Sequence, residues 1–266
     1  MPRILPLFTK ALTDSWRSTL GWAVGLTGAC MLYLPLYPSI GGSAQMQGLI
    51  KALPPEMTKA LNYDQIASGP GYTQATMFGL IGFLLMSMAS IGWGASAVAG
   101  DEESGLLELT LAHSVTRVQV VLERAFAIVV RIAFLSVLVF LVVLGLNGPA
   151  QLGIDVGHLA GAALLFAALA LLSGTAALFA GALTGRKVYA VAAGAAVAGL
   201  GYVFNAVGRQ SPDVEWLLNL SPYHWAYGNS PVAYGADWGA VAGLFAISAA
   251  LIALGAVALR HRDVGI

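Results

Sequence analysis

Residues 101–124 read DEESGLLELTLAHSVTRVQVVLER and are the one strongly charged island in an otherwise apolar sequence. Asp101 can cap the start of a helix, and Glu102 and Glu103 would then lie in its first turn. There their negative charge favours the positive end of the helix dipole. The stretch therefore predicts a short helix over 101–112, between two segments long enough to cross a bilayer.

The predicted short helix has an apolar side. Leu107 and Leu111 are four residues apart, and Leu106 and Leu109 are three apart. These spacings place the leucines along one side of a helix, with Glu108 off it.

A second helix is predicted to begin after a turn. Thr116 with Gln119 three residues later fits a capping box. From Arg117 this helix has about 30 residues and a length of about 45 Å, which exceeds the ~30 Å hydrocarbon core of a bilayer. Its first turns must therefore stand outside the membrane, and the charged stretch forms an elbow that a soluble partner can push or pull.

The composition places the whole chain in a membrane. Of the 266 residues 58% are hydrophobic and 10% are charged, with a mean hydropathy of +0.78, whereas a soluble domain carries roughly 25% charged residues. The formal net charge is zero, which argues against a nucleic-acid partner because such binding needs a basic excess. The single Cys30 excludes an internal disulfide and a cysteine-rich metal site.

We expect an all-α polytopic membrane protein that forms a single transmembrane domain over 1–266. Basic residues among apolar ones predict that 1–17 is an amphipathic helix lying on the membrane surface. Six later segments are apolar over roughly 20 residues or more, the length that a bilayer requires. They are 18–38, 74–99, 121–146, 158–183, 188–207 and 238–259.

Two polar segments, 39–73 and 208–237, are predicted to be outward loops. In the first, residues 69–71 (Gly-Pro-Gly) are interpreted as a helix breaker, and 54–61 as a short helix that begins at two prolines. The second is dense in aromatic residues, which suits the membrane interface. These are Trp216, Tyr223, Trp225, Tyr227 and Tyr234.

The basic residues predict the orientation. With both termini inside, the inner segments carry most of the lysines and arginines, as the positive-inside rule requires. The inner ones are Arg3, Lys10, Arg17, Arg117, Arg124, Arg131, Arg186, Lys187, Arg260 and Arg262, and the outer ones are Lys51, Lys59 and Arg209.

The sequence offers no catalytic or nucleotide-binding arrangement. Membrane prenyl-proteases carry an arginine four residues after a Glu-Glu pair, and here Leu107 stands there. Residues 94–97 lack the last glycine of an intramembrane serine-protease turn, and 181–187 match a phosphate loop only in part. We expect no Asp or Glu inside the apolar spans, which argues against a proton-relay transporter. The chain is therefore expected to bind no metal and no nucleotide itself.

Arginines recur every seven residues along the third predicted span. Arg117, Arg124 and Arg131 form one stripe, and Arg131 falls about 9 Å inside the apolar run that starts at Ala125. Two interpretations remain open. Arg131 either extends to the lipid headgroups or forms a buried pair with an acid of the elbow or with Asp14, which would lock the elbow to the membrane helix.

Two other helix faces each allow a structural and a functional interpretation. Ala190, Gly194 and Ala198 form a small-residue ridge on the fifth span, which packs either within one bundle or against a second subunit. Four residues at helical spacing on the second span form a face that is either core or the wall of an adaptable apolar cavity. They are Phe83, Met86, Ser90 and Trp93.

Residues 101–112, followed by 114–117 (SVTR), resemble the signature of type-two ABC permeases, which are the membrane subunits of many bacterial ABC exporters. That signature reads acidic-Glu-x-Gly-Thr-Leu-Glu-x-Leu-Leu-x-x-Pro-Val-x-Arg. The chain departs from it at Leu106, where Thr is common, and at Ser114, where Pro is common. Two further segments are similar to the polyketide-antibiotic exporter branch, 51–57 (KALPPEM) and 220–225 (LSPYHW).

The resemblance implies that 101–112 is a coupling helix seated in a cleft of a separate ATPase subunit, which binds ATP and Mg. Two ATPase copies and a second permease half, either this chain or a sister, would complete an exporter in a bacterial plasma membrane. Its substrate would be amphipathic or apolar, and spans two and five would line the route. The coupling residues would be Asp101, Glu102, Glu103, Gly105, Leu107, Glu108, Leu111 and Arg117. A non-transporting membrane scaffold or regulatory subunit, or a secondary transporter, remains an alternative.

Overall fold

The computed structural model describes residues 5–39, 43, 67–112 and 115–263. All regular structure in these residues is helical, and six helices are long and apolar enough to cross a membrane. This confirms the predicted all-α polytopic membrane fold. The spans are Trp16–Leu36, Gly69–Glu103, Arg117–Asn147, Val156–Thr184, Lys187–Gly208 and Trp238–His261.

The elements follow one another with short connections. Helix α1 (Pro6–Asp14) precedes α2 (Trp16–Tyr33) with its short extension η1 (Leu34–Leu36). The second span combines α6 (Gly69–Thr73), the π-helix η2 (Gln74–Ile81), α7 (Gly82–Ala95), the π-helix η3 (Ser96–Gly100) and α8 (Asp101–Glu103). After it come α9 (Leu106–Leu111), α10 (Arg117–Asn147), α11 (Val156–Thr184) and α12 (Lys187–Gly208). The chain ends with η4 (Pro212–Leu220), α13 (Pro222–Tyr227), α14 (Pro231–Tyr234) and α15 (Trp238–His261).

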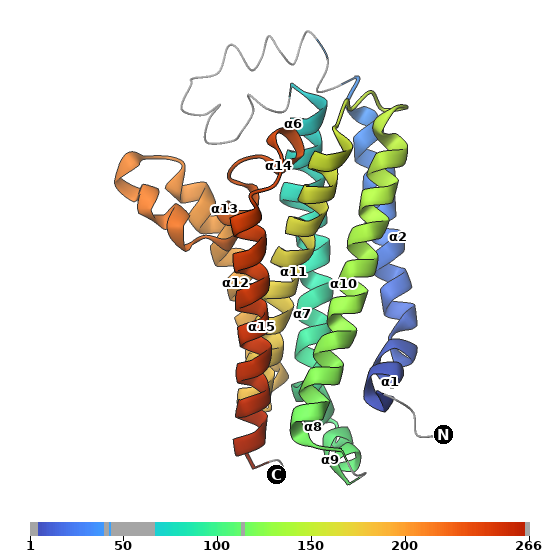
Figure 1. Ribbon diagram of the computed structural model, residues 1–266, viewed down its shortest axis with the longest axis vertical. Helices are drawn as coiled ribbons and strands as arrows, with labels where there is room; N and C mark the ends of the chain where they lie inside the picture. The colour runs from blue at the N-terminus through green and yellow to red at the C-terminus, as the bar shows by residue number, and fades with distance from the viewer. Residues whose placement is uncertain (1–4, 40–42, 44–66, 113–114, 264–266) are drawn as a thin grey trace.

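The two ends of the bundle differ in what they carry. Figure 1 shows α1, α8, α9 and the last turn of α15 at one end, and α6, α14 and the α10–α11 connection at the other. The elbow end therefore holds both ends of the described chain, as an even number of crossings requires.

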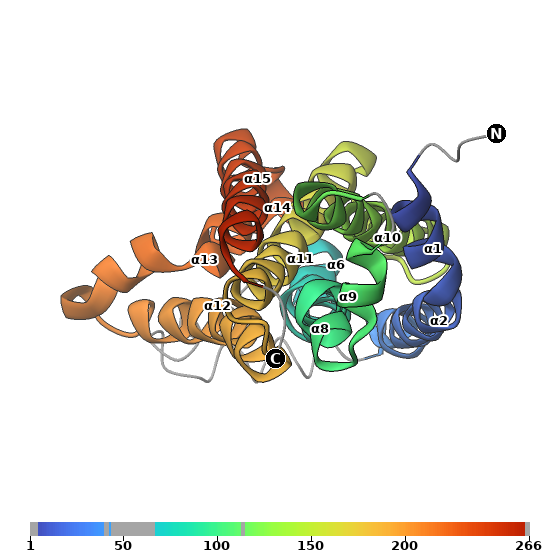
Figure 2. The same cartoon turned by 90° about the horizontal axis from the view of Figure 1, so that it is seen from below.

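Helix α11 lies at the centre of the bundle, in contact with α7, α10, α12 and α15 (Figure 2). It is almost entirely buried. Small residues allow this close packing. A Cβ atom built on Gly94 of α7 would lie 2.1 Å from the carbonyl oxygen of Gly174 in α11, so the two helices meet through their backbones.

The second span begins earlier than predicted, because residues 69–71 start the helix and do not break it. The side chain of Ser68 accepts a hydrogen bond from the Gly71 amide at 3.1 Å, and Pro70 lies in the first turn. Proline is tolerated there because the amide it lacks has no partner within the helix. The predicted short helix over 54–61 lies outside the described residues.

The second predicted outer loop is mostly helical. Figure 1 shows η4 and α13 projecting from the bundle beside α12. Tyr223 of α13 donates a hydrogen bond at 2.8 Å to the carbonyl of Gly79 in η2, and its ring centroid lies 5.1 Å from that of Phe83. Tyr223 and Tyr227 are buried, so their prediction as interface residues is wrong, whereas Trp216 and Tyr234 are exposed.

Candidate functional site

The charged elbow begins as a continuation of the second span. The helix continues through Asp101 without a break, and its last hydrogen bonds run from Ser104 N to Gly100 O and from Gly105 N to Glu102 O. Gly105 then adopts φ +73°, a left-handed conformation that ends helices and that glycine adopts without a Cβ clash. The prediction that Asp101 caps a helix start is therefore wrong. The three acidic residues lie at a helix C-terminus, where the dipole disfavours them.

Arginines from two other helices compensate this acidic helix end. Arg124 of α10 forms an ion pair with Asp101, and its second nitrogen donates to the Ala97 carbonyl at 2.8 Å. Arg262, which follows α15, forms an ion pair with Glu102. Both pairs are mostly shielded from solvent, with side-chain exposures between 14% and 21%. These pairs join the end of the second span to the third and sixth spans.

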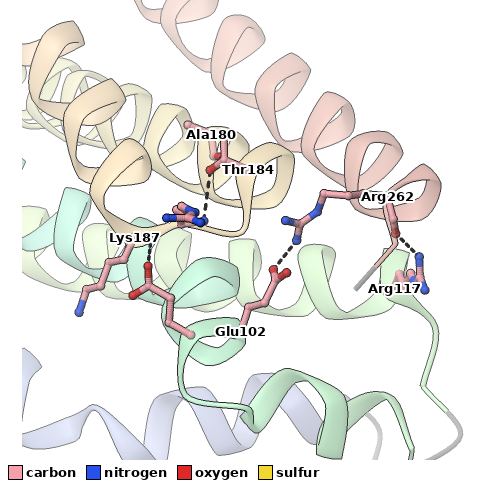
Figure 3. A network of polar contacts seen from close by, with 8 residues as sticks. Glu102, Arg117, Ala180, Thr184, Lys187 and Arg262 are labelled. Carbon is pink, nitrogen blue, oxygen red and sulfur yellow. Dashed lines mark hydrogen bonds and ion pairs between the residues drawn. The ribbon is translucent and has the colours of Figure 1, made fainter. Parts of the chain in front are cut away.

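Two further contacts extend the network, which Figure 3 shows from close by. Glu103 accepts a hydrogen bond from the Lys187 amide at 2.9 Å, at the first residue of α12. Arg117, the first residue of α10, donates to the carbonyl of Arg262. The end of the second span is thus connected to the third, fifth and sixth spans at one end of the bundle.

Helix α9 presents a mixed apolar and acidic surface. Leu106 and Glu108 are exposed, and Leu109 is 62% exposed. Leu107, which we had included among the contact residues, is fully buried in the core, and Leu111 packs partly against it. The sequence could not distinguish the two pairs of leucines because both have helical spacing. The exposed surface of α9 is therefore formed by Leu106, Glu108 and Leu109, which we call the α9 surface.

The start of α10 is as predicted. The Thr116 side chain accepts a hydrogen bond from the Gln119 amide at 3.1 Å, which confirms the cap. The Gln119 side chain does not return to Thr116 but donates to Glu123 at 2.6 Å. The turn residues His113 and Ser114 lie outside the described part of the chain.

Glu123 is a functional candidate that the sequence interpretation missed. It lies in α10 and is only 3% exposed, so the expectation of no acid inside a span is wrong. One carboxylate oxygen accepts hydrogen bonds from the amides of Leu7 and Phe8, at 2.7 and 2.9 Å. These amides belong to the first turn of α1, where helix N–H groups lack partners and the dipole favours an anion. A lone acid early in a long apolar helix was the available signal.

Arg131 follows neither predicted interpretation. It is 7% exposed, so it does not extend to the surface, and none of the ion pairs in the described chain includes it or Asp14. It donates to the Ala11 carbonyl of α1, and its guanidinium carbon lies 5.3 Å from the ring centroid of Trp93. Arg124, one stripe position earlier, forms the pair that we had assigned to Arg131.

The predicted cavity face of the second span lies inside the chain. All four residues are buried, and each contacts a different neighbour. Phe83 stacks on Tyr202 with centroids 6.5 Å apart, whereas the Trp93 indole donates to the Ser18 hydroxyl at 3.2 Å. A Cβ built on Gly174 would lie 2.0 Å from the Ser90 hydroxyl oxygen. In this conformation Phe83, Met86, Ser90 and Trp93 are therefore core residues.

The small-residue ridge on α12 also packs within the chain. A Cβ on Gly194 would lie 2.8 Å from the Ser173 carbonyl oxygen and 2.9 Å from Ile91. Ala190 is fully buried and Ala198 nearly so. The three residues therefore face α11 and α7 and are not available to a second subunit.

This arrangement is a six-span bundle with a charged elbow joined to several spans. The family described as "Multidrug efflux system permease Rv1217c, C-terminal domain" matches residues 11–260. The chain belongs to this family. It is thus a permease of the multidrug efflux type, a membrane protein that works with other transporter components. A comparison with curated proteins found no match.

Proposed function

We propose that the chain is one membrane half of an ATP-driven exporter and that the α9 surface is where a separate ATPase subunit docks. The observation that carries this proposal is a short helix with exposed Leu106 and Leu109 beside Glu108, held outside the bundle at the end of a span. Exposed leucines on such a protrusion fit an apolar cleft on a partner, because their burial there removes apolar surface from water. The membership of an efflux-permease family supports the same proposal.

The network around α8 gives this docking a mechanical consequence. A force on α9 acts through Gly105 on the end of the second span, which is ion-paired to α10 and to the residue after α15. Glu103 also holds the first turn of α12. Movement of the ATPase would therefore displace the elbow ends of four spans together. This is the form of coupling that an exporter needs to open and close a route.

The complete exporter needs two such halves and two ATPase subunits, which bind ATP and Mg. The second half is another copy of this chain or a sister permease. In this assembly both termini and the elbow face the cytoplasm of a bacterium, consistent with the distribution of basic residues. The substrate is amphipathic or apolar. The route lies between the two halves, because the predicted cavity residues of the second span are used for packing within one half.

The α9 surface can be tested by adding charge to it. Leu109→Glu should abolish co-purification of the permease with the ATPase encoded beside it and should remove drug export from cells. Thr13→Glu is the matched control, because Thr13 is exposed on α1 at the same end of the bundle, away from α9. The control should retain both properties, and both variants should have the melting temperature of the unmodified permease in detergent.

The outcomes separate the candidate functions. If Leu109→Glu still binds the ATPase and supports export, the docking proposal is wrong. If the unmodified chain binds the ATPase but drug addition never changes ATP hydrolysis or export, the scaffold alternative is favoured. Drug export that continues with the ATPase deleted would favour a secondary transporter.

A further inference from the structure

A groove on the outer surface of the bundle has a composition that the transport proposal does not use. It has a volume of about 360 Å³ and lies between α1, α2 and α10. Its walls are apolar except for Thr19 and Arg131. Trp16, Leu20 and Phe134 line it and remain about half exposed, which places its opening on the face that the bilayer covers.

Arg131 is a cation without a compensating anion. In the described residues its only hydrogen-bond acceptor is the Ala11 carbonyl, and its buried Nε has no partner at all. The other neighbour given for the guanidinium is the Trp93 ring. A buried charge with so few partners is costly, so the groove offers a strong reason for an anionic group to bind.

The charges around the groove have the same sign. On α1 and the start of α2, Lys10 and Arg17 are exposed, with Arg17 over the Trp16 ring at 5.5 Å. Asp14 is also exposed, and Glu123 is engaged by the first amides of α1. The surface at this end of the groove therefore carries an excess of positive charge.

We propose that this groove binds one anionic phospholipid from the leaflet nearest α1. Its phosphate would approach the guanidinium of Arg131, which can bind phosphate oxygens with two parallel hydrogen bonds. One acyl chain would lie along the apolar wall beside Leu20 and Phe134. A phospholipid is the occupant that combines these two chemistries and is present wherever the chain is embedded. The bound lipid would tie α1 to α2 and α10.

This inference requires the membrane location but not ATP-driven export, so the two proposals fail independently. The test uses native mass spectrometry of the detergent-purified permease with added dioleoyl phosphatidylglycerol or dioleoyl phosphatidylcholine. The unmodified chain should retain one phosphatidylglycerol in preference to phosphatidylcholine. Arg131→Gln should weaken this binding by about tenfold, the effect of losing one charge-assisted contact. Arg260→Gln removes an exposed arginine remote from the groove and should bind as the unmodified chain does.

A second variant keeps Arg131 in place. Thr19→Phe fills the groove, and the Thr19 hydroxyl that it removes bonds only to the Ser15 carbonyl of its own helix end. It should lose phosphatidylglycerol binding while melting at the same temperature as the unmodified chain in lipid-free detergent. If Arg131→Gln does not fold, Thr19→Phe decides the question. Unchanged binding in the folded variants, or equal binding of phosphatidylcholine by the unmodified chain, would overturn the proposal.

Discussion

The ion pair between Arg124 and Asp101 joins the first third of α10 to the end of the second span, at the point where the chain leaves the bundle for α9. Arg124 also donates to the Ala97 carbonyl of the π-helix η3, one turn earlier in the same span. The α10 helix therefore holds both the backbone and the charge of the helix end on which the elbow is built.

Removing this arginine should destabilise the elbow end of the bundle. Arg124→Gln leaves Asp101 largely buried without its partner, and we expect a loss of about 1–3 kcal/mol, between the values for exposed and fully buried pairs. A double-mutant cycle with Asp101→Asn, read by thermal unfolding in detergent, checks it. The double variant should be more stable than the sum of the two single effects predicts. Strict additivity would show that the pair contributes nothing.

Gly105 should be required for its backbone conformation and not for space. A Cβ atom there would meet nothing within 4 Å, yet φ is +73°. Gly105→Ala should therefore cost about 1 kcal/mol through strain alone, and Gly105→Asn should cost less because Asn tolerates this conformation. Gly100→Ala is the matched control, since Gly100 is helical and its Cβ would make only ordinary contacts. Equal melting temperatures for the alanine variants at 105 and 100 would contradict this account.

Two glycines of α12 should respond differently to the same substitution. Gly194→Ala places a methyl group 2.8 Å from a backbone oxygen of α11 and should destabilise the permease by about 1–3 kcal/mol. Gly199→Ala meets nothing within 4 Å and should be neutral or slightly stabilising, because alanine favours the helix. Thermal unfolding of the two variants tests whether the small-residue ridge packs within one chain. A neutral Gly194→Ala would reopen the subunit-interface interpretation.

Glu123 should hold α1 against α10. Glu123→Gln replaces a charged acceptor for the Leu7 and Phe8 amides by a neutral one, and should weaken this attachment by about 1 kcal/mol. Hydrogen exchange of the peptide that covers α1 should then be about fivefold faster. Glu108→Gln, which changes an exposed acid on α9, should leave that exchange rate unaltered. If both variants leave α1 equally protected, the packing of Phe8 on Phe126 holds the helix by itself.

His224 should make the opposite end of the bundle sensitive to acid. Burial, with a smaller contribution from the charge of Arg209, lowers the pKa of His224 below its usual value of 6.5. The folded state therefore favours the neutral ring, which lies 3.1 Å from the Asn205 amide oxygen through its Nδ1. Stability should be complete above pH 6.5 and should fall as the pH drops below it. Melting temperatures should show a smaller acid loss in His224→Gln, and an unchanged loss in His261→Gln.

Several features could be predicted because they depend on neighbouring residues in the chain. A span of apolar residues cannot stay in water, so six long apolar runs predict six crossings whatever their partners are. The Thr116 cap is a contact across three residues, and its sequence pattern is sufficient. Residues 69–71 were misread for a related reason. Gly and Pro break helices in their interior but are compatible with a first turn, and composition does not distinguish these positions.

The sequence by itself determined the class of the protein, the number of crossings and the place of the charged elbow, since hydropathy and capping are local properties. Only the tertiary structure decided that Arg124, and not Arg131, pairs with the elbow, that Glu123 holds α1, and that Leu107 faces inward while Leu109 faces outward. A helical repeat places residues on a stripe, but the stripe does not specify which helix faces it. That choice depends on how six helices pack together, and here it follows from backbone contacts at glycines such as Gly94 and Gly174.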